Sequence, residues 1–267
     1  MENNSLLDVQ HLSHMFHLKR KMTVKAIDDV SFQIKKGEIY GLVGESGSGK
    51  STVARCIMNI YKPSEGEIFY KGIPICKSKE FRKNRKMLQM TRQMIFQDSA
   101  SSLNPRMKIE DIVAEPLRIY SGKGRPGKKE IEKQLELVGL DRSYMEKYPC
   151  ELSGGQRQRV AIARALSTKP ELIVADEPIA SLDVSIQAQM VNLFQKEQGF
   201  SFLFIAHDLS MVEFLCDRTG VMYHGKLVEE GRTQDIFAHP EHEYTKALLA
   251  AVPIPDPRIE RQKGEVL

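Results

Sequence analysis

The segment GESGSGKS, residues 44–51, has the residue types and the spacing of a phosphate-binding loop, and it is called the P-loop below. An apolar strand pattern ends just before it, and a helical pattern begins just after it. In that setting glycine lets backbone N–H groups curl around a phosphate. Lys50 would reach the β- and γ-phosphates of a nucleotide, and Ser51 would give its hydroxyl to Mg²⁺. The residues expected at the nucleotide are Gly44, Glu45, Ser46, Gly47, Ser48, Gly49, Lys50, Ser51 and Thr52.

A second candidate site is LIVADEP, residues 172–178, an apolar strand pattern that ends in two acids. A carboxylate at a strand end can hold Mg²⁺ on a nucleotide, directly or through water, and Asp176 fits that role. Glu177 is placed to polarise a water for attack on the γ-phosphate. The alternative is an acidic pair that only caps the next element, and the P-loop in the same chain weighs against it.

Two further polar residues follow apolar runs, as strand ends do. His207 ends FSFLFIAH, residues 200–207, and could contact a γ-phosphate as a hydrogen-bond donor. Gln97 follows a short apolar run and could touch Mg²⁺ or the attacking water. Taken alone, each of these residues favours a structural role.

The segment LSGGQRQRVAIARAL, residues 152–166, places two glycines before a helical pattern. Backbone N–H groups at the start of a helix bind anions. The chain therefore contains a second candidate phosphate site, although one nucleotide needs only one such loop.

The order of patterns predicts an α/β fold built on a mainly parallel sheet. Alternating patterns at residues 6–12 and 26–34 predict a separate antiparallel piece, and residues 79–150 are expected to be a mainly helical insertion. Residues 221–231 read as a closing hairpin, and the Pro-rich tail at 252–267 reads as extended.

The composition argues against nucleic-acid binding, a cysteine metal site and a membrane-spanning segment. The 267 residues are 41% hydrophobic and 28% charged, with a net charge of +4, which is ordinary for a globular protein and too weakly basic to indicate nucleic acid. The basic run at residues 77–94 is interpreted as a solvated helix face, with an anionic-lipid or acidic-partner contact as the alternative. Four cysteines show no metal-binding spacing, and no apolar run is long enough to span a bilayer.

Together these motifs resemble the ATP-binding-cassette (ABC) ATPases. The P-loop, Gln97, LSGGQRQR, the Asp176–Glu177 strand end, SLD at 181–183 and His207 occur in the order seen in that family. The resemblance implies a P-loop NTPase core with an antiparallel β subdomain and a helical insertion. It implies one nucleotide-binding domain over residues 1–251, with a helical subdomain at about 98–160 and a tail at 252–267.

The resemblance also implies what the second candidate phosphate site binds. In this family two cassettes stack head to tail, so LSGGQ would bind the γ-phosphate of the partner's ATP. The residues that would do so are Ser153, Gly154, Gly155 and Gln156, and Asp183 would cross the same interface. The implied cofactors are ATP and Mg²⁺, with Ser51, Gln97 and Asp176 around the metal. The implied catalytic residues are Glu177, His207 and Gln97.

A finer resemblance is to the oligopeptide and dipeptide importer ATPases of bacteria, which include nickel importers. Residues 96–120, 183–194 and 242–257 are similar to segments of those proteins, and the basic loop HLKRKMT suits their second ATPase subunit. Phe16 would then stack on adenine. The implied partners are a related but different cassette, two permeases and, indirectly, an extracytoplasmic substrate-binding protein, with no nucleic acid. The implied location is the cytoplasmic face of the cell membrane, as a peripheral protein.

Three departures and several alternatives remain open. DEPIASLD stands where DEPxSALD is usual, Cys150 stands where His is common, and the tail lacks the cysteines that could hold an iron–sulfur cluster in some relatives.

The alternatives are a nickel or metallophore importer, a soluble cassette ATPase acting on DNA or ribosomes, and an exporter cassette. The segment from Gln97 to about Tyr120 is expected to dock a permease helix, with Arg106 and Glu115 in the contact.

Overall fold

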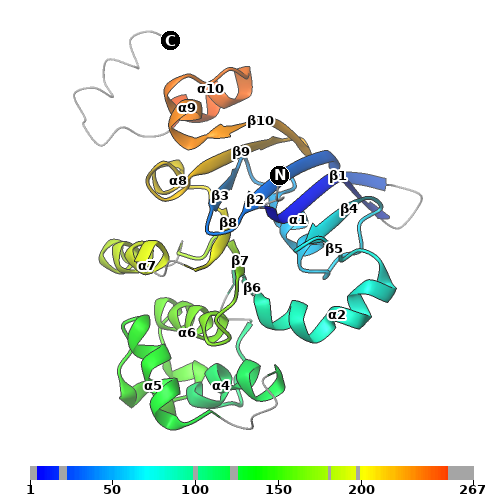
Figure 1. Ribbon diagram of the computed structural model, residues 1–267. Helices are drawn as coiled ribbons and strands as arrows, with labels where there is room; N and C mark the ends of the chain where they lie inside the picture. The colour runs from blue at the N-terminus through cyan, green and yellow to red at the C-terminus, as the bar shows by residue number, and fades with distance from the viewer. Residues whose placement is uncertain are drawn as a thin grey trace, which may run out of the picture.

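The computed structural model describes residues 5–17, 23–98, 102–120, 126–179, 182–196 and 199–251, and its centre is a six-stranded sheet (Figure 1). The strand order is β10-β9-β3-β8-β7-β6, with β10 antiparallel to β9 and the other neighbours parallel. The strands are β3 (Ile39–Val43), β6 (Arg92–Ile95), β7 (Leu172–Asp176), β8 (Ser201–Ile205), β9 (Arg218–Tyr223) and β10 (Lys226–Arg232). The predicted mainly parallel sheet and the closing hairpin are confirmed.

The central strands are buried on both faces, which explains their continuous apolar sequence. Every residue of β7 and β8 is buried. Alternate side chains enter two different cores: Ile173 and Phe202 pack on one face, whereas Val174 and Leu203 pack on the other. The sheet is therefore the middle layer of a three-layer molecule.

The second sheet is antiparallel, with strand order β2-β1-β4-β5. Its strands are β1 (Ser5–His17), β2 (Thr23–Lys35), β4 (Glu65–Tyr70) and β5 (Ile73–Pro74). The predicted antiparallel piece is confirmed, but β1 and β2 extend beyond residues 6–12 and 26–34. They pair with each other from Ser5 and Lys35 to His17 and Thr23, so backbone hydrogen bonds continue where the apolar alternation ends.

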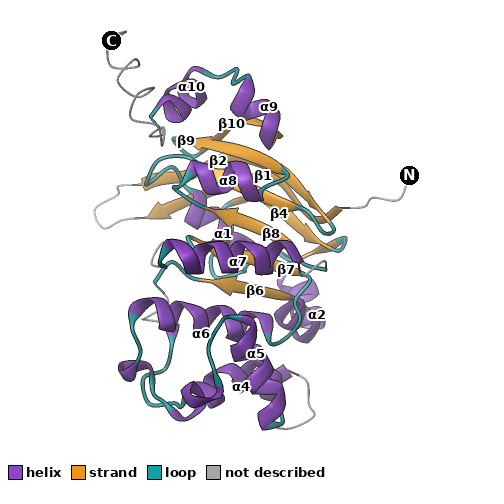
Figure 2. Ribbon diagram, turned by 90° about the vertical axis from the view of Figure 1, so that its left-hand side faces the viewer, coloured by secondary structure: helices purple, strands orange, loops and turns teal. Residues whose placement is uncertain are grey.

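Helices fill the remaining space on both sides of the parallel sheet. Helix α1 (Lys50–Ile57) contributes Val53, Ala54 and Ile57 to the core shared by the two sheets. The opposite face is covered by α6 (Gly154–Leu166), α7 (Val184–Lys196) and α8 (Leu209–Leu215). In Figure 2, α7 and α8 lie in front of the strands, and α6 lies just below β6. No helix in the described part of the chain has the length and apolar character needed to cross a membrane.

A group of helices lies beside β6 at the edge of the sheet (Figure 1). It contains α4 (Ile109–Tyr120), α5 (Lys128–Leu137), the 3₁₀ turns η1 (Arg142–Glu146) and η2 (Pro149–Glu151), and the start of α6. Apolar residues of α4, α5 and α6 share one core, which includes Val113, Leu135 and Val160. The expected helical region is present, and its boundaries at about 98 and 160 stay a prediction.

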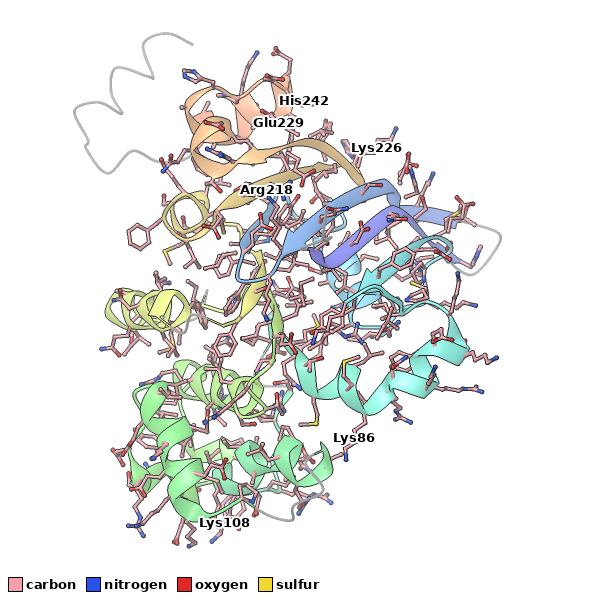
Figure 3. All side chains as sticks on the ribbon, viewed as in Figure 1. Lys86, Lys108, Arg218, Lys226, Glu229 and His242 are labelled. Atoms are coloured by element: carbon pink, nitrogen blue, oxygen red, sulfur yellow. The ribbon has the colours of Figure 1, made fainter. Side chains whose placement is uncertain are left out.

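Two expectations about residues 77–94 and 79–150 need correction. Helix α2 (Ser78–Thr91) does expose the basic side chains Arg82, Lys83, Arg85 and Lys86, and Lys86 points outward in Figure 3. Arg92, however, is buried in β6, which belongs to the central sheet and interrupts the expected insertion. Four residues are too short for a periodic signal, so only pairing with β7 identifies this strand.

The C-terminal part of the described chain forms two short helices beside β10. Helix α9 (Thr233–Ala238) and helix α10 (Glu243–Ala250) follow β10 and lie next to it (Figure 1). The tail expected to be extended, residues 252–267, lies outside the described residues.

Candidate functional site

The P-loop connects β3 to α1 and has a backbone that only glycine adopts easily at several positions. Gly44, Gly47 and Gly49 have φ of 142°, 82° and 106°. A Cβ on Gly44 would lie 2.1 Å from the carbonyl oxygen of Met222, and one on Gly49 would lie 2.4 Å from that of Ala26. The glycine spacing is therefore required both by the turn and by strands packed against it.

Lys50 is folded back onto its own loop. Its ammonium donates to the carbonyl oxygens of Gly44 and Glu45, at 2.7 Å each, and to Ser48 Oγ at 3.2 Å. Only 5% of the residue is exposed. Burial lowers the pKa of Lys50, and the neighbouring Glu177 and Asp176 oppose that shift. The ammonium is thus held over the loop and has to turn outward to meet a phosphate.

Ser51 and Asp176 meet at the base of the site. Ser51 Oγ donates to Asp176 Oδ1 at 3.1 Å, and Asp176 is 2% exposed at the end of β7. Burial raises the pKa of Asp176, and the Ser51 bond opposes that shift. A hydroxyl and a carboxylate oxygen side by side are the hard oxygen ligands that suit Mg²⁺, so these two residues fit the metal expected from the sequence.

Glu177 is the point where three predicted residues meet. Its backbone has φ of 50°, a left-handed conformation, and its N–H donates to Ile205 O at 2.9 Å. Gln97 Nε2 donates to Glu177 Oε2 at 2.8 Å. His207 Nε2 lies 2.6 Å from Glu177 Oε1. Parallel strands β6, β7 and β8 end at the same edge of the sheet, which is why residues 97, 177 and 207 converge.

Lys50, Ser51, Gln97, Glu177 and His207 line one small cavity of about 190 Å³. It is bounded by P-loop residues, by β2 and by the three strand ends. The lining residues are Ala26, Ser46, Gly47, Gly49, Lys50, Ser51, Thr52, Gln97, Glu177 and His207. Six of the predicted nucleotide residues, 46, 47 and 49–52, therefore share one cavity with the three predicted catalytic residues.

The LSGGQ segment forms a separate helix start. Ser153 is the N-cap of α6: its Oγ accepts from the Gln156 N–H at 3.3 Å, while Gln156 Oε1 accepts from the Ser153 N–H at 2.9 Å. Gln156 also donates to Tyr144 Oη at 3.0 Å, which orients its side chain. Among the described residues that line the P-loop cavity, none comes from residues 153–156. The candidate phosphate site at the start of α6 is therefore not part of the P-loop cavity of its own chain.

Two predicted residues lie at other places. Asp183 is exposed ahead of α7, and its carbonyl accepts from the N–H groups of Ile186 and Gln187. Phe16 lies near the end of β1 and packs edge-on against His14 and Tyr61, with ring centroids 4.7 and 5.4 Å apart. Phe16 does not line the cavity, and its adenine contact stays a prediction. Ala180 and Ser181, the departure in the DEPIASLD segment, lie outside the described residues.

Family models match two parts of the chain. One, described as ABC transporter, matches residues 27–180, and one, described as oligopeptide/dipeptide transporter, C-terminal region, matches residues 228–267. The chain belongs to the ABC transporter family. It is an ABC ATPase, and the family resemblance expected from the motifs is confirmed.

Curated relatives of this ABC ATPase agree with that assignment. The oligopeptide transport ATP-binding protein OppF of Streptococcus mutans is 51% identical, over 97% of this chain and 85% of that protein. OppF of Bacillus subtilis is 52% identical, over 97% and 86%. The dipeptide transport ATP-binding protein DppF of Lactococcus lactis is 46% identical, over 100% and 87%.

Solved structures match the fold of this cassette. A dimeric, post-hydrolysis state of the ATP-binding cassette MJ0796, bound to ADP and Pi, matches with a TM-score of 0.77 and 28% identity over 85% of this chain and 98% of that one. CbiO1 of Clostridium perfringens, part of an ABC transporter complex, matches with a TM-score of 0.73 and 27% identity over 98% and 100%.

Two tyrosines that hydrogen-bond to predicted site residues were not predicted from the sequence. Tyr144 holds Gln156, and Tyr244 accepts a hydrogen bond from the P-loop N–H of Glu45 at 2.9 Å. Neither stands in a pattern that predicts such a contact, because each meets its partner only through the tertiary fold.

Proposed function

We propose that this chain is the ATP-hydrolysing subunit of a bacterial ABC importer for oligopeptides or dipeptides. The observation that supports it most is the Glu177 carboxylate, held between Gln97 and His207 at the mouth of the P-loop cavity. A carboxylate in that place can polarise a water beside a γ-phosphate. The relatives described above are oligopeptide and dipeptide transport proteins, which supports peptides over nickel or a metallophore as the cargo.

Each cavity residue has a role in the proposed reaction. The P-loop N–H groups bind the phosphates, and Lys50 turns from its two carbonyl partners to the β- and γ-phosphates. Ser51, Asp176 and Gln97 would hold Mg²⁺, which neutralises phosphate charge. Glu177 orients the water, and His207 donates to the γ-phosphate. Phe16 is proposed to stack on adenine.

The helix start at Ser153 supports a head-to-tail dimer. The N–H groups at the start of α6 favour an anion, and a Cβ on Gly154 would meet nothing within 4 Å, so the surface above them is open. Since they do not line their own chain's cavity, we propose that Ser153, Gly154, Gly155, Gln156 and Asp183 complete the ATP site of a second cassette. That a solved cassette of similar fold is dimeric supports this arrangement.

A groove beside β6 supports the permease contact. It has a volume of about 320 Å³ and lies between α2, β6 and α4. Its lining includes the exposed apolar side chains of Ile60 and Ile119, together with Glu115 and Arg164. Apolar side chains together with charged ones suit a short amphipathic helix. Two permeases, a related second cassette and an indirect substrate-binding protein are the proposed partners, and the cytoplasmic face of the membrane is the proposed location.

ATP turnover by the purified chain tests this proposal. The comparison is between wild type, Glu177→Gln and the control Glu171→Gln, which alters a carboxylate at the opposite end of β7 that pairs with Lys71. We expect wild-type activity to rise faster than linearly with protein concentration. Glu177→Gln should form an ATP-dependent dimer and lose at least about 100-fold in turnover, since it lacks the general base.

The outcomes separate the parts of the proposal. A control that behaves as wild type places the effect at Glu177. A wild-type chain that binds ATP but stays monomeric and inactive would indicate that an unlike cassette is obligatory, and co-purification with the permeases would then identify it. A chain that binds no ATP with Mg²⁺ would refute the function.

A further inference from the structure

We propose that Tyr244 is a positioning residue for the P-loop, whose hydroxyl fixes the Gly44–Glu45 peptide and thereby sets the affinity of the cavity for ATP. Tyr244 lies 199 residues after Glu45, in helix α10, and neither residue lines the cavity. The inference rests on the ATP site proposed above, because it assigns a role in that site to an element outside it.

The peptide between Gly44 and Glu45 is held at both of its polar ends. Its N–H donates to Tyr244 Oη at 2.9 Å, and its carbonyl accepts from Lys50 Nζ at 2.7 Å. Tyr244 and Lys50 therefore hold one rigid plane from opposite sides. Any rotation of that plane would move the carbonyl that anchors the Lys50 ammonium.

Tyr244 is itself fixed in place by the fold. Its ring stacks on Tyr223, with centroids 4.1 Å apart and an interplanar angle of 27°. The start of α10 is tied to β10 by the Glu229 carboxylate, which accepts from the N–H groups of Glu241 and His242 at 2.9 and 3.1 Å. His242 Nδ1 accepts from the Tyr244 N–H at 3.1 Å. Figure 3 shows Glu229 and His242 close together where α10 meets β10.

The turn that follows Tyr223, between β9 and β10, also contacts the P-loop. The Gly225 N–H donates to Ser48 O at 3.0 Å, and the Met222 carbonyl approaches Gly44 so closely that no Cβ would fit. The β9–β10 turn and α10 thus form one support along the outer side of the P-loop. Burial raises the pKa of Tyr244, so the phenol stays neutral at physiological pH.

The hydrogen bond between Tyr244 and Glu45 contributes more to the order of the P-loop when Lys50 moves. Once the ammonium turns to a phosphate, Gly44 O loses its partner, and the Tyr244 hydroxyl is left holding the peptide. Without that hydroxyl the exposed Glu45 N–H turns to water, and the loop samples orientations that do not bind phosphate. ATP binding would then have to order the loop again.

The test compares Tyr244→Phe with Tyr223→Phe in the full chain. Both remove one phenolic hydroxyl from the same stacked pair, and among the described residues no hydrogen bond of the Tyr223 hydroxyl is seen. We expect Tyr244→Phe to raise the Kd for ATP with Mg²⁺ about three- to tenfold by calorimetry, as for loss of one hydrogen bond. Tyr223→Phe should stay within about twofold of wild type, and the two variants should have the same Tm.

A second variant approaches the bond from its other end. Glu45→Pro removes the N–H donor and leaves Tyr244 intact. If both changes act on one bond, Tyr244→Phe should add no loss of ATP affinity in the Glu45→Pro background, whereas additive losses would overturn the inference. An unchanged Kd for Tyr244→Phe, or an equal rise for Tyr223→Phe, would overturn it too. Wild-type protein that binds no ATP would instead contradict the proposed function.

Discussion

At the scale of single residues, Arg92 shows how the proposed permease groove is supported. It is 3% exposed and has no carboxylate partner among the described residues. Its guanidinium donates to Ile57 O at 2.7 Å and to Asn59 Oδ1 at 3.1 Å, and it lies over the ring of Tyr70. Burial lowers the pKa of Arg92 to about 10, so it remains charged at neutral pH. One residue thus joins the end of α1 to β4 and β6.

Replacing Arg92 should therefore cost stability. Arg92→Met retains much of the apolar bulk but leaves the buried Ile57 carbonyl without its donor, and we expect a loss of about 2–3 kcal/mol in the free energy of unfolding. Urea unfolding measures it. The control Arg85→Met, on the exposed face of α2, should change the value by less than about 0.5 kcal/mol. Equal losses in both variants would show that the hydrogen bonds of Arg92 contribute little.

At the scale of elements, the Glu229 carboxylate holds the segment that leads into the short helix α10. Burial alone would raise the pKa of Glu229, but the bonds from the backbone N–H groups of Glu241 and His242 outweigh it, and the pKa lies below its ordinary value. The carboxylate on β10 therefore fixes the residues just before α10, while His242 is the N-cap of the helix itself. Through Tyr244, the same helix reaches the P-loop.

The contact of Glu229 with the segment before α10 has a defined pH dependence. A lowered pKa in the folded state adds stability above the ordinary glutamate pKa of about 4.3, and that stability is lost as the pH falls through the lowered pKa. Glu229→Gln should thus lower the free energy of unfolding by about 1 kcal/mol at pH 7, because it weakens two hydrogen bonds to a charged acceptor. The difference should vanish in acid, and thermal melts over this pH range measure it. A difference that does not change with pH would mean that the charge of Glu229 does not stabilise the segment before α10.

At the scale of the whole molecule, the P-loop cavity and the proposed permease groove both lie next to β6. Gln97 follows that strand into the cavity, while Arg92, Gln93 and Met94 line the groove. A movement of β6 relative to the helix group would therefore reach both places. Glu115, on α4, borders the groove, and its charge opposes the effect of burial on the pKa of Arg164.

Charge reversal at the groove should separate transport from ATP binding. We expect two variants to lower peptide uptake about tenfold or more in cells, with the Kd for ATP unchanged. They are Glu115→Lys in the groove and Arg106→Glu, at an exposed position before α4 that does not line the groove. The control Glu136→Lys reverses an exposed charge on α5, away from the groove, and should leave uptake unchanged. Loss of ATP binding in the groove variants would show that this surface maintains the cassette itself.

The sequence by itself determined the local chemistry of this ABC ATPase. Glycine spacing, a lysine and a hydroxyl at fixed offsets identify the P-loop, because these residue types lie within eight consecutive positions of the chain. Continuous apolar runs ending in Asp176, Glu177 and His207 identify buried strands and the edge at which they end, because burial on both faces leaves no alternation. The α/β fold followed from the order of these patterns.

The tertiary structure alone decided which distant groups meet. The short strand β6, the burial of Arg92 and the contact between Tyr244 and Glu45 join residues that are up to 199 positions apart. Such contacts depend on strand order and on the packing of the three layers, which arise from burial summed over the whole chain. A four-residue strand or a single hydroxyl contributes too little to any local pattern to reveal its partner, so these features were visible only once the layers were assembled.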